Sequence, residues 1–196
     1  MARNKGFTFV EKKKIITKEV VKESLGTLFY CCAAILLGAV LVVAFGMKTS
    51  VIGSSMSPKL ENGQEVLVDR FLFKLISPAR FDVVCFYPKG NKNANLYIKR
   101  VIGLPGETVQ IKEGSVYING VKLIEDDEYN VDGIDDAGLA ESEFLLGSEE
   151  YFVLGDNRNN SEDSRTGNIG DVKKDTMVGK VWFKLGTNNF DFGLIK

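Results

Sequence analysis

The longest apolar stretch of the chain is a run of 24 uncharged residues, from Ser24 to Met47. At about 1.5 Å per residue, this run would form a helix of ~36 Å, which can cross a hydrocarbon core of ~30 Å with some tilt. It is apolar on all sides rather than along one stripe, unlike a helix at the surface of a soluble domain. A cleaved signal peptide has a shorter apolar core of about 7–15 residues. The pattern therefore predicts one transmembrane helix over residues 24–47.

After residue 48 the pattern changes to short segments typical of β-strands. These segments are rich in Val, Ile, Phe and Tyr and are bounded by Gly, Pro or Asn. Asn119-Gly120 stands between two of them and is a strong signal for a two-residue hairpin. We expect residues 48–196 to form one mainly β domain. The predicted strands are Glu65–Asp69, Phe81–Tyr87, Leu96–Gly103, Glu107–Ile111, Ser115–Ile118, Tyr151–Leu154 and Met177–Leu185.

Charge is distributed unevenly along the chain. Residues 1–23 carry seven basic and three acidic side chains, a net charge of +4, whereas the whole chain has a net charge of −1. Because basic residues mark the cytoplasmic end of a membrane helix, residues 1–23 should be cytoplasmic and residues 48–196 extracytoplasmic. Residues 125–150 contain eleven acids and no Lys or Arg, which favours an acidic surface insertion over a calcium site without EF-hand spacing. The overall balance gives no indication of a nucleic-acid partner.

The sequence contains no histidine, and this restricts its chemistry. A Ser-His-Asp triad, a Cys-His dyad or a His-ligated zinc site cannot form within the chain. The Ser-x-x-Lys, Gly-x-Ser-x-Gly and Gly-x-x-x-x-Gly-Lys patterns of other enzyme classes are missing as well. Three cysteines without a Cys-x-x-Cys pair do not make a disulfide framework. We expect no metal and no cofactor, with Lys, Tyr, Cys or a carboxylate as the acid–base group.

Lys99 interrupts an otherwise apolar predicted strand. Alternation places it on one face with Tyr97 and Val101, and places Arg100 on the other face. A lysine on an edge strand, with its ammonium in water, would give this pattern. Burial among apolar neighbours would instead lower the pKa of the lysine and supply a neutral amine, which can activate a serine hydroxyl.

Two polar segments contain candidate serines. Residues 51–58, Val-Ile-Gly-Ser-Ser-Met-Ser-Pro, place three serines in a turn preceded by glycine. Residues 155–165, Gly-Asp-Asn-Arg-Asn-Asn-Ser-Glu-Asp-Ser-Arg, fit a solvated turn. Alternatively, Asp156, Arg158, Asp163 and Arg165 could fix this loop through bidentate pairs, and the loop could then present Ser161 to a neighbour.

Taken together, these segments resemble the bacterial type I signal peptidases, a family of membrane-anchored Ser/Lys endopeptidases. The resemblance runs from the predicted helix to about Leu185 and rests on residues 55–58, 80–84, 97–107 and 155–165, in the family's order. It implies a signal-peptidase-like antiparallel β fold, with Ser55 as the nucleophile and Lys99 as the general base. It also implies supporting roles: Ser161 would orient the lysine amine, Asp163 and Arg165 would pair to hold their loop, and Gly155, Asp156, Asn157 and Met56 would support the site.

Gly53 departs from some members of that family. Those relatives supply one oxyanion donor from a serine hydroxyl two residues before the nucleophile, and here Gly53 occupies that position. The backbone N–H of Ser55 is the natural first donor. The second donor is left open, with a water or another backbone group as alternatives.

The resemblance implies removal of N-terminal signal peptides from secreted preproteins after a small-x-small motif. Ser55 follows Met47 by eight residues, so we expect a site near the outer membrane surface, where an extended precursor would bind by strand addition. One alternative is a catalytically silent relative that acts as a membrane-tethered binding or scaffold protein. Another is a Ser/Lys protease similar to the self-cleaving SOS repressors, although the chain has a predicted anchor and lacks a helix-turn-helix region. The Lys- and Asn-rich composition and the small outer domain suggest a Gram-positive bacterium.

Overall fold

The computed structural model describes residues 18–125, 133–186 and 191–195 of the chain. The chain divides into two units, Met1–Leu41 and Val42–Lys196, which are considered separately. Helix α1 (Lys18–Phe45) provides one span that is long and apolar enough to cross a membrane, Lys18–Leu41, and none of that span is buried by other parts of the chain. The helix begins six residues before the uncharged run that starts at Ser24. Residues 1–17 of the expected cytoplasmic segment lie outside the described residues.

The second unit is mainly β, as the sequence predicted. All seven predicted strands are confirmed, with ends that differ by at most two residues. Short 3₁₀ turns occur at Pro88–Gly90, Gly138–Ala140 and Lys174–Thr176. The elements of this unit are β1 (Met47–Ser50), β2 (Glu65–Asp69), α2 (Phe71–Leu75), β3 (Val83–Phe86), β4 (Tyr97–Gly103), β5 (Thr108–Lys112), β6 (Ser115–Ile118), β7 (Val121–Lys122), β8 (Phe144–Leu145), β9 (Glu150–Leu154), β10 (Val172–Lys173), β11 (Met177–Lys184) and β12 (Gly193–Leu194).

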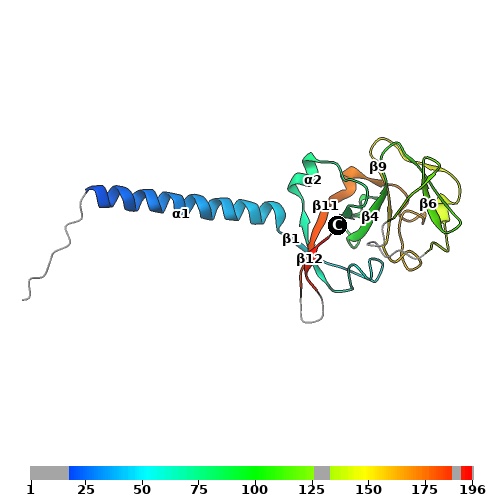
Figure 1. Ribbon diagram of the computed structural model, residues 1–196, viewed down its shortest axis with the longest axis horizontal. Helices are drawn as coiled ribbons and strands as arrows, with labels where there is room; N and C mark the ends of the chain where they lie inside the picture. Colours follow the sequence, from blue (N-terminus) through cyan, green and yellow to red (C-terminus); the bar gives the residue numbers. More distant parts are fainter. Residues whose placement is uncertain (1–17, 126–132, 187–190, 196) are drawn as a thin grey trace, which may run out of the picture. The chain divides into compact units, whose positions relative to one another are not determined.

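The strands form two antiparallel sheets. The larger has the order β1-β2-β11-β3-β4-β9-β10, with β12 added beside β11, and the smaller has the order β7-β6-β5-β8. Within the second unit, β1 and β12 lie at one end and the smaller sheet, around β6, at the other (Figure 1). Asn119 and Gly120 have φ angles of 51° and 78° and join β6 to β7. Positive φ at both central residues is what a type I′ hairpin turn requires, so the hairpin prediction is confirmed.

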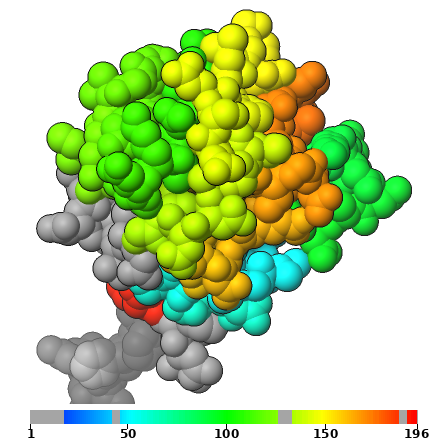
Figure 2. Space-filling model, turned by 90° about the vertical axis from the view of Figure 1, so that its right-hand side faces the viewer, coloured from blue at the N-terminus to red at the C-terminus, as the bar shows by residue number. Residues whose placement is uncertain are grey.

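The acidic segment extends the smaller sheet rather than standing apart from it. Strand β8 lies within the segment and pairs with β5, and the two regions lie side by side on one face, green and yellow in Figure 2. Acidic side chains such as Asp135 and Glu141 are exposed, while Ile134 and Leu146 are buried in a core cluster with strands of the smaller sheet. The apolar residues of this segment therefore contribute to the core, and its acids face solvent. Residues 126–132 of the segment lie outside the described residues.

Strand β4 lies in the interior of the larger sheet. It pairs with β3 on one side and with β9 on the other, and its residues from Ile98 to Gly103 are all buried. The alternative of an edge-strand lysine is therefore wrong for Lys99. The side chains of Lys99 and Arg100 are only 4% and 1% exposed. A buried cation of this kind either pairs with an anion or loses its proton and becomes neutral.

Candidate active site

Ser55 lies in the loop that connects β1 to β2, and core packing fixes that loop. Met56 and Leu60 are fully buried in a core cluster with residues of the larger sheet, so their packing holds the loop in place. Gly53 has a φ of 85°, which a residue with a Cβ rarely adopts, and its N–H donates to Asn62 Oδ1 at 2.8 Å. The Ser55 side chain remains half-buried beside a groove.

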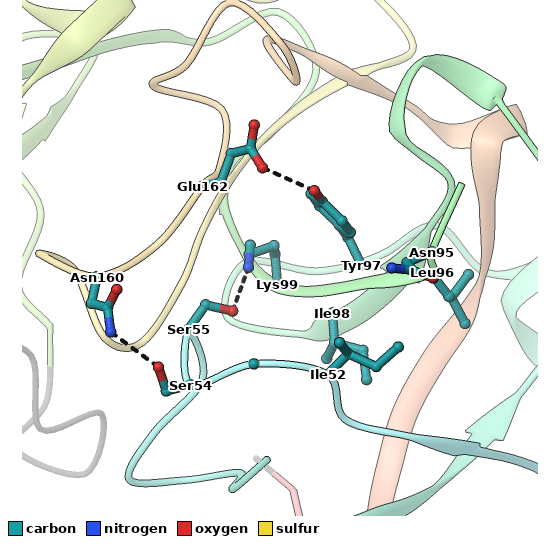
Figure 3. Close-up of a pocket in the computed structure, with 11 residues that line it drawn as sticks. Ile52, Ser54, Ser55, Asn95, Leu96, Tyr97, Ile98, Lys99, Asn160 and Glu162 are labelled. Carbon is teal, nitrogen blue, oxygen red and sulfur yellow. Dashed lines mark hydrogen bonds between the residues drawn. The ribbon is translucent and has the colours of Figure 1, made fainter. Parts of the chain in front are cut away.

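The Lys99 amine reaches this serine from β4. Its Nζ lies 2.5 Å from Ser55 Oγ, and the two groups face each other in Figure 3. Burial lowers the pKa of Lys99 from 10.5 to about 8 because the ammonium loses hydration, although the negative charges of Asp163, Glu162 and Asp156 act in the opposite direction. With that pKa, about a tenth of the amine is neutral at pH 7. The site therefore contains a base that functions near neutral pH, next to a hydroxyl that it can deprotonate.

The loop after β9 carries the predicted pair Asp163–Arg165, and the structure brings the two together. Arg165 Nε and Nη2 donate to the two carboxylate oxygens of Asp163 at 2.8 and 2.9 Å. Asp163 is fully buried, and its Oδ2 also accepts the N–H of Gly155 at 3.1 Å. The pair therefore holds both ends of the loop in a charge-assisted network.

Asp156 and Arg158 of this loop form ion pairs with residues outside the loop. Asp156 accepts from Nε and Nη2 of Arg100 on β4, both at 2.7 Å, and both side chains are at most 1% exposed. Arg158 donates to both carboxylate oxygens of Glu125, one at 3.0 Å, at the start of the acidic segment. The prediction of bidentate pairs is confirmed, but Arg100 and Glu125 were not predicted as partners. Arg100 had one signal in the sequence, since an arginine inside an apolar strand requires a counter-charge.

Gly155 and Asn157 place the loop against the nucleophile. A Cβ at Gly155 would lie 2.2 Å from Ser161 Oγ and 2.5 Å from the carbonyl oxygen of Ser55, so only glycine fits there. The N–H of Asn157 donates to that same carbonyl at 3.0 Å, and its side-chain amide donates to the carbonyl of Ser54 at 3.2 Å. Both residues thus fix the main chain on either side of the Ser55 side chain.

Ser161 does not make its expected contact. Its Oγ is buried and forms no hydrogen bond with any residue that the structure describes, so it does not bind the Lys99 amine. It packs instead in the space that Gly155 leaves open. The hydrogen bond from Ser161 to the lysine is absent from this arrangement.

A groove of about 340 Å³ passes over Ser55 and Lys99. Asn160 Nδ2 donates to Ser54 Oγ at 3.0 Å along one side, and Tyr97 OH donates to Glu162 Oε2 at 2.9 Å along another (Figure 3). The sequence contained these residues within the recognised segments, but it did not show that their side chains reach the groove. In the described ranges, no group of three or more Cys, Asp or Glu side chains could hold a metal ion. The residues that line the groove are Ile52, Gly53, Ser54, Ser55, Asn95, Leu96, Tyr97, Ile98, Lys99, Asn160 and Glu162.

Comparison with known proteins identifies the family to which this arrangement belongs. A family model described as "Signal peptidase, peptidase S26" matches residues 23–185. The chain belongs to this signal peptidase family. Signal peptidase I T of Bacillus subtilis is 33% identical over 182 residues, which cover 86% of this chain and 91% of that relative. Signal peptidase I V of the same organism is 35% identical over 155 residues, covering 71% of this chain and 89% of the relative.

A crystal structure of a signal peptidase I from Enterococcus faecalis is 36% identical in sequence and covers 54% of this chain and 97% of that one, with a TM-score of 0.41. The sequence matches alone carry the assignment, and they confirm the resemblance that the motifs indicated. This signal peptidase family member is a serine endopeptidase, and its N-terminal apolar helix makes it a membrane-anchored protein.

Proposed function

We propose that this chain removes N-terminal signal peptides from exported preproteins, with Ser55 as the nucleophile and Lys99 as the general base. The observation that carries the proposal is the 2.5 Å separation of Lys99 Nζ and Ser55 Oγ, combined with burial of the amine. A serine hydroxyl is a weak nucleophile unless a neighbouring base accepts its proton. The buried lysine is a base of this kind, because its pKa of about 8 leaves part of it neutral under physiological conditions.

The reaction then proceeds in two stages. Neutral Lys99 accepts the proton of Ser55 Oγ, which attacks the scissile carbonyl and forms a tetrahedral intermediate. The Lys99 ammonium returns that proton to the leaving amine, which becomes the N-terminus of the mature protein, and an acyl-enzyme ester remains on Ser55. Lys99 next takes a proton from a water, whose oxygen attacks the ester carbonyl. The Lys99 ammonium then returns this proton to Ser55 Oγ as the ester bond breaks, and the signal peptide leaves as a carboxylic acid.

The developing oxyanion requires hydrogen-bond donors on the far side of the carbonyl. The backbone N–H of Ser55 makes no hydrogen bond to a residue of the described ranges, which leaves it available as the first donor. Gly53 supplies no hydroxyl, so we assign the second position to a water or another backbone N–H.

The groove suits an extended substrate with small side chains. Ile52, Leu96 and Ile98 give it apolar walls. Strand β9 pairs with β4 only from Arg100 onward, so the part of β4 from Tyr97 to Lys99 has a strand partner on one side only within the described ranges, and a bound segment can pair along its other side. Shallow apolar walls select small residues, in agreement with a small-x-small cleavage motif. The basic N-terminal segment supports a cytoplasmic N-terminus and an extracytoplasmic residue range 48–196, and we propose a Gram-positive bacterial membrane as its location.

Cleavage of a purified preprotein by the full chain in detergent tests the dyad. Ser55→Ala should abolish cleavage, and Lys99→Met should lower it by about 10²–10⁴-fold, the usual contribution of a general base. Ser142→Ala and Lys112→Ala are controls that change the same residue types at exposed positions, and both should cleave normally. Normal processing by either dyad variant would refute the assignment. A wild-type protein that binds the preprotein without cleaving it would instead support the catalytically silent alternative.

The orientation has a separate test. Protease added to intact cells should cut the chain within residues 125–150 if that segment is extracytoplasmic. Complete protection of the segment, with cutting observed only after the membrane is permeabilised, would overturn the proposed topology.

A further inference from the structure

Glu162 differs from Asp156 and Asp163, the other acidic residues in the loop after β9, because it lines the groove. Its Oε2 accepts from Tyr97 OH at 2.9 Å and its Oε1 accepts from Asn168 Nδ2 at 3.0 Å, so two donors fix the carboxylate. Figure 3 shows Glu162 with its carboxylate directed at the tyrosine, and both Glu162 and Lys99 line the groove. The Tyr97 ring in turn lies 5.5 Å from Lys99 Nζ. Tyr97 and Glu162 therefore form the wall next to the general base.

Three carboxylates and one guanidinium act on the charge of the Lys99 amine, namely those of Asp156, Glu162, Asp163 and Arg165. The charge of Asp163 is paired with Arg165, and that of Asp156 is paired with Arg100, each through two hydrogen bonds. Glu162 has neutral partners, Tyr97 and Asn168, and forms no salt bridge within the described part of the chain. Its negative charge is thus the one in this set that no arginine compensates.

We propose that Glu162, held by Tyr97 and Asn168, stabilises the protonated form of Lys99 and so raises the pH above which the peptidase becomes active. This inference rests on the proposed role of Lys99 as the general base. Glu162 acts through the lysine rather than on the substrate, so it is a positioning residue and not a catalytic one. Tyr97 contributes by keeping the carboxylate on the groove side of the loop.

The direction of the effect follows from the charge. Removing the carboxylate removes a group that favours the ammonium, so the amine of a Glu162→Gln variant should lose its proton at a lower pH. Because Glu162 is exposed, solvent weakens the interaction, and a shift of roughly 0.2–0.7 pH units is expected. At a pH well below the midpoint, where the neutral fraction rises tenfold per pH unit, such a shift raises the neutral fraction by about two- to fivefold. High salt should reduce the difference between variant and wild type, because it screens exposed charges.

The experiment compares the pH dependence of kcat/KM for the wild type with three variants of the full chain in detergent. Glu162→Gln should move the acidic limb of the kcat/KM profile, where activity rises with pH, to lower pH. Glu162→Asp retains the charge and should move this limb less. Glu141→Gln removes another exposed acid, one that does not line the groove, and should leave the limb where it is. An acidic limb in Glu162→Gln that coincides with that of Glu141→Gln, together with an unchanged titration of the Lys99 amine in the labelling measurement below, would overturn the inference.

A second measurement separates this inference from the proposed function. In the Ser55→Ala background, the rate at which an amine-reactive acylating reagent modifies Lys99 is followed against pH by mass spectrometry. A lower midpoint in Glu162→Gln supports the effect of Glu162 on the lysine without any reference to catalysis, and an unchanged midpoint refutes it. If the labelling midpoint shifts while the kinetic limb does not, the inference about Glu162 holds and the role of Lys99 as the base fails.

Discussion

The buried pair Arg100–Asp156 allows a quantitative test of how the active-site loop is held. Asp156→Asn preserves the shape of the side chain but removes the negative charge that compensates Arg100. Both side chains are at most 1% exposed, so the guanidinium would remain in the interior, and water cannot replace the lost charge. Removing one partner of such a pair costs about 3–5 kcal/mol, because the other charge remains buried and uncompensated. This is a large share of the total free energy of unfolding, which is about 5–15 kcal/mol for a typical domain.

Thermal and denaturant unfolding of the full chain in detergent would measure this cost. For a domain of this size, we expect the melting temperature of Asp156→Asn to fall by about 6–20 °C. Glu65→Gln is the matched control, since it breaks the Lys48–Glu65 pair, whose side chains are 52% and 35% exposed, and it should cost at most about 1 kcal/mol. The double variant Arg100→Met with Asp156→Ala should lose less stability than the sum of its single changes. Equal losses in Asp156→Asn and Glu65→Gln would refute the argument from desolvation.

Three further predictions concern the same domain. Lys99→Met should raise the free energy of unfolding at pH 7 by about 3 kcal/mol, although it lowers cleavage strongly, because the folded pKa of about 8 lies below the unfolded value of 10.5. The wild type therefore gains this stability only as the pH rises between those two values, and a pH titration of wild-type unfolding that is flat from 8 to 10.5 would contradict the prediction. Gly155→Ala should reduce kcat strongly because its Cβ would collide with Ser161 Oγ, whereas Gly167→Ala, where nothing lies within 4 Å of the added Cβ, should retain activity in the same cleavage assay. Cys85 should resist alkylation at pH 8 until the protein unfolds, because burial raises the pKa of its thiol to about 12, and rapid labelling of the folded protein would show that the strand opens.

The pattern of strand-forming and turn residues was sufficient to predict most of the longer strands. Runs such as Glu65–Asp69 and Ser115–Ile118 are rich in strand-forming residues and lie near turn residues such as Gly63 and Asn119, so local chemistry alone predicts them. Short strands such as β8 and β10 have two residues each, and pairing with a neighbouring strand decides them rather than any pattern of their own. The acidic segment shows the same limit, because its charge dominates the sequence while its few apolar residues determine its place in the core.

The sequence by itself determined the type of chemistry. Without histidine, a general base had to come from another residue type, and Lys99 in an apolar strand was the candidate for a serine such as Ser55. The motif order then indicated the family. These conclusions follow from the identity of residues and from the short distances along the chain between the residues of each motif, and the sequence contains both.

Only the tertiary structure decided which side chains meet. Burial of Lys99 depends on β4 having a neighbour on each side, and that pairing joins strands far apart in the chain. Whether Asp156 binds Arg100, and whether Glu162 turns toward the groove while the adjacent Asp163 turns toward Arg165, depends on side-chain directions that the folded loop imposes. Long-range pairing and burial fix the partners and the pKa of a charged group, and neither can be obtained from its position in the sequence.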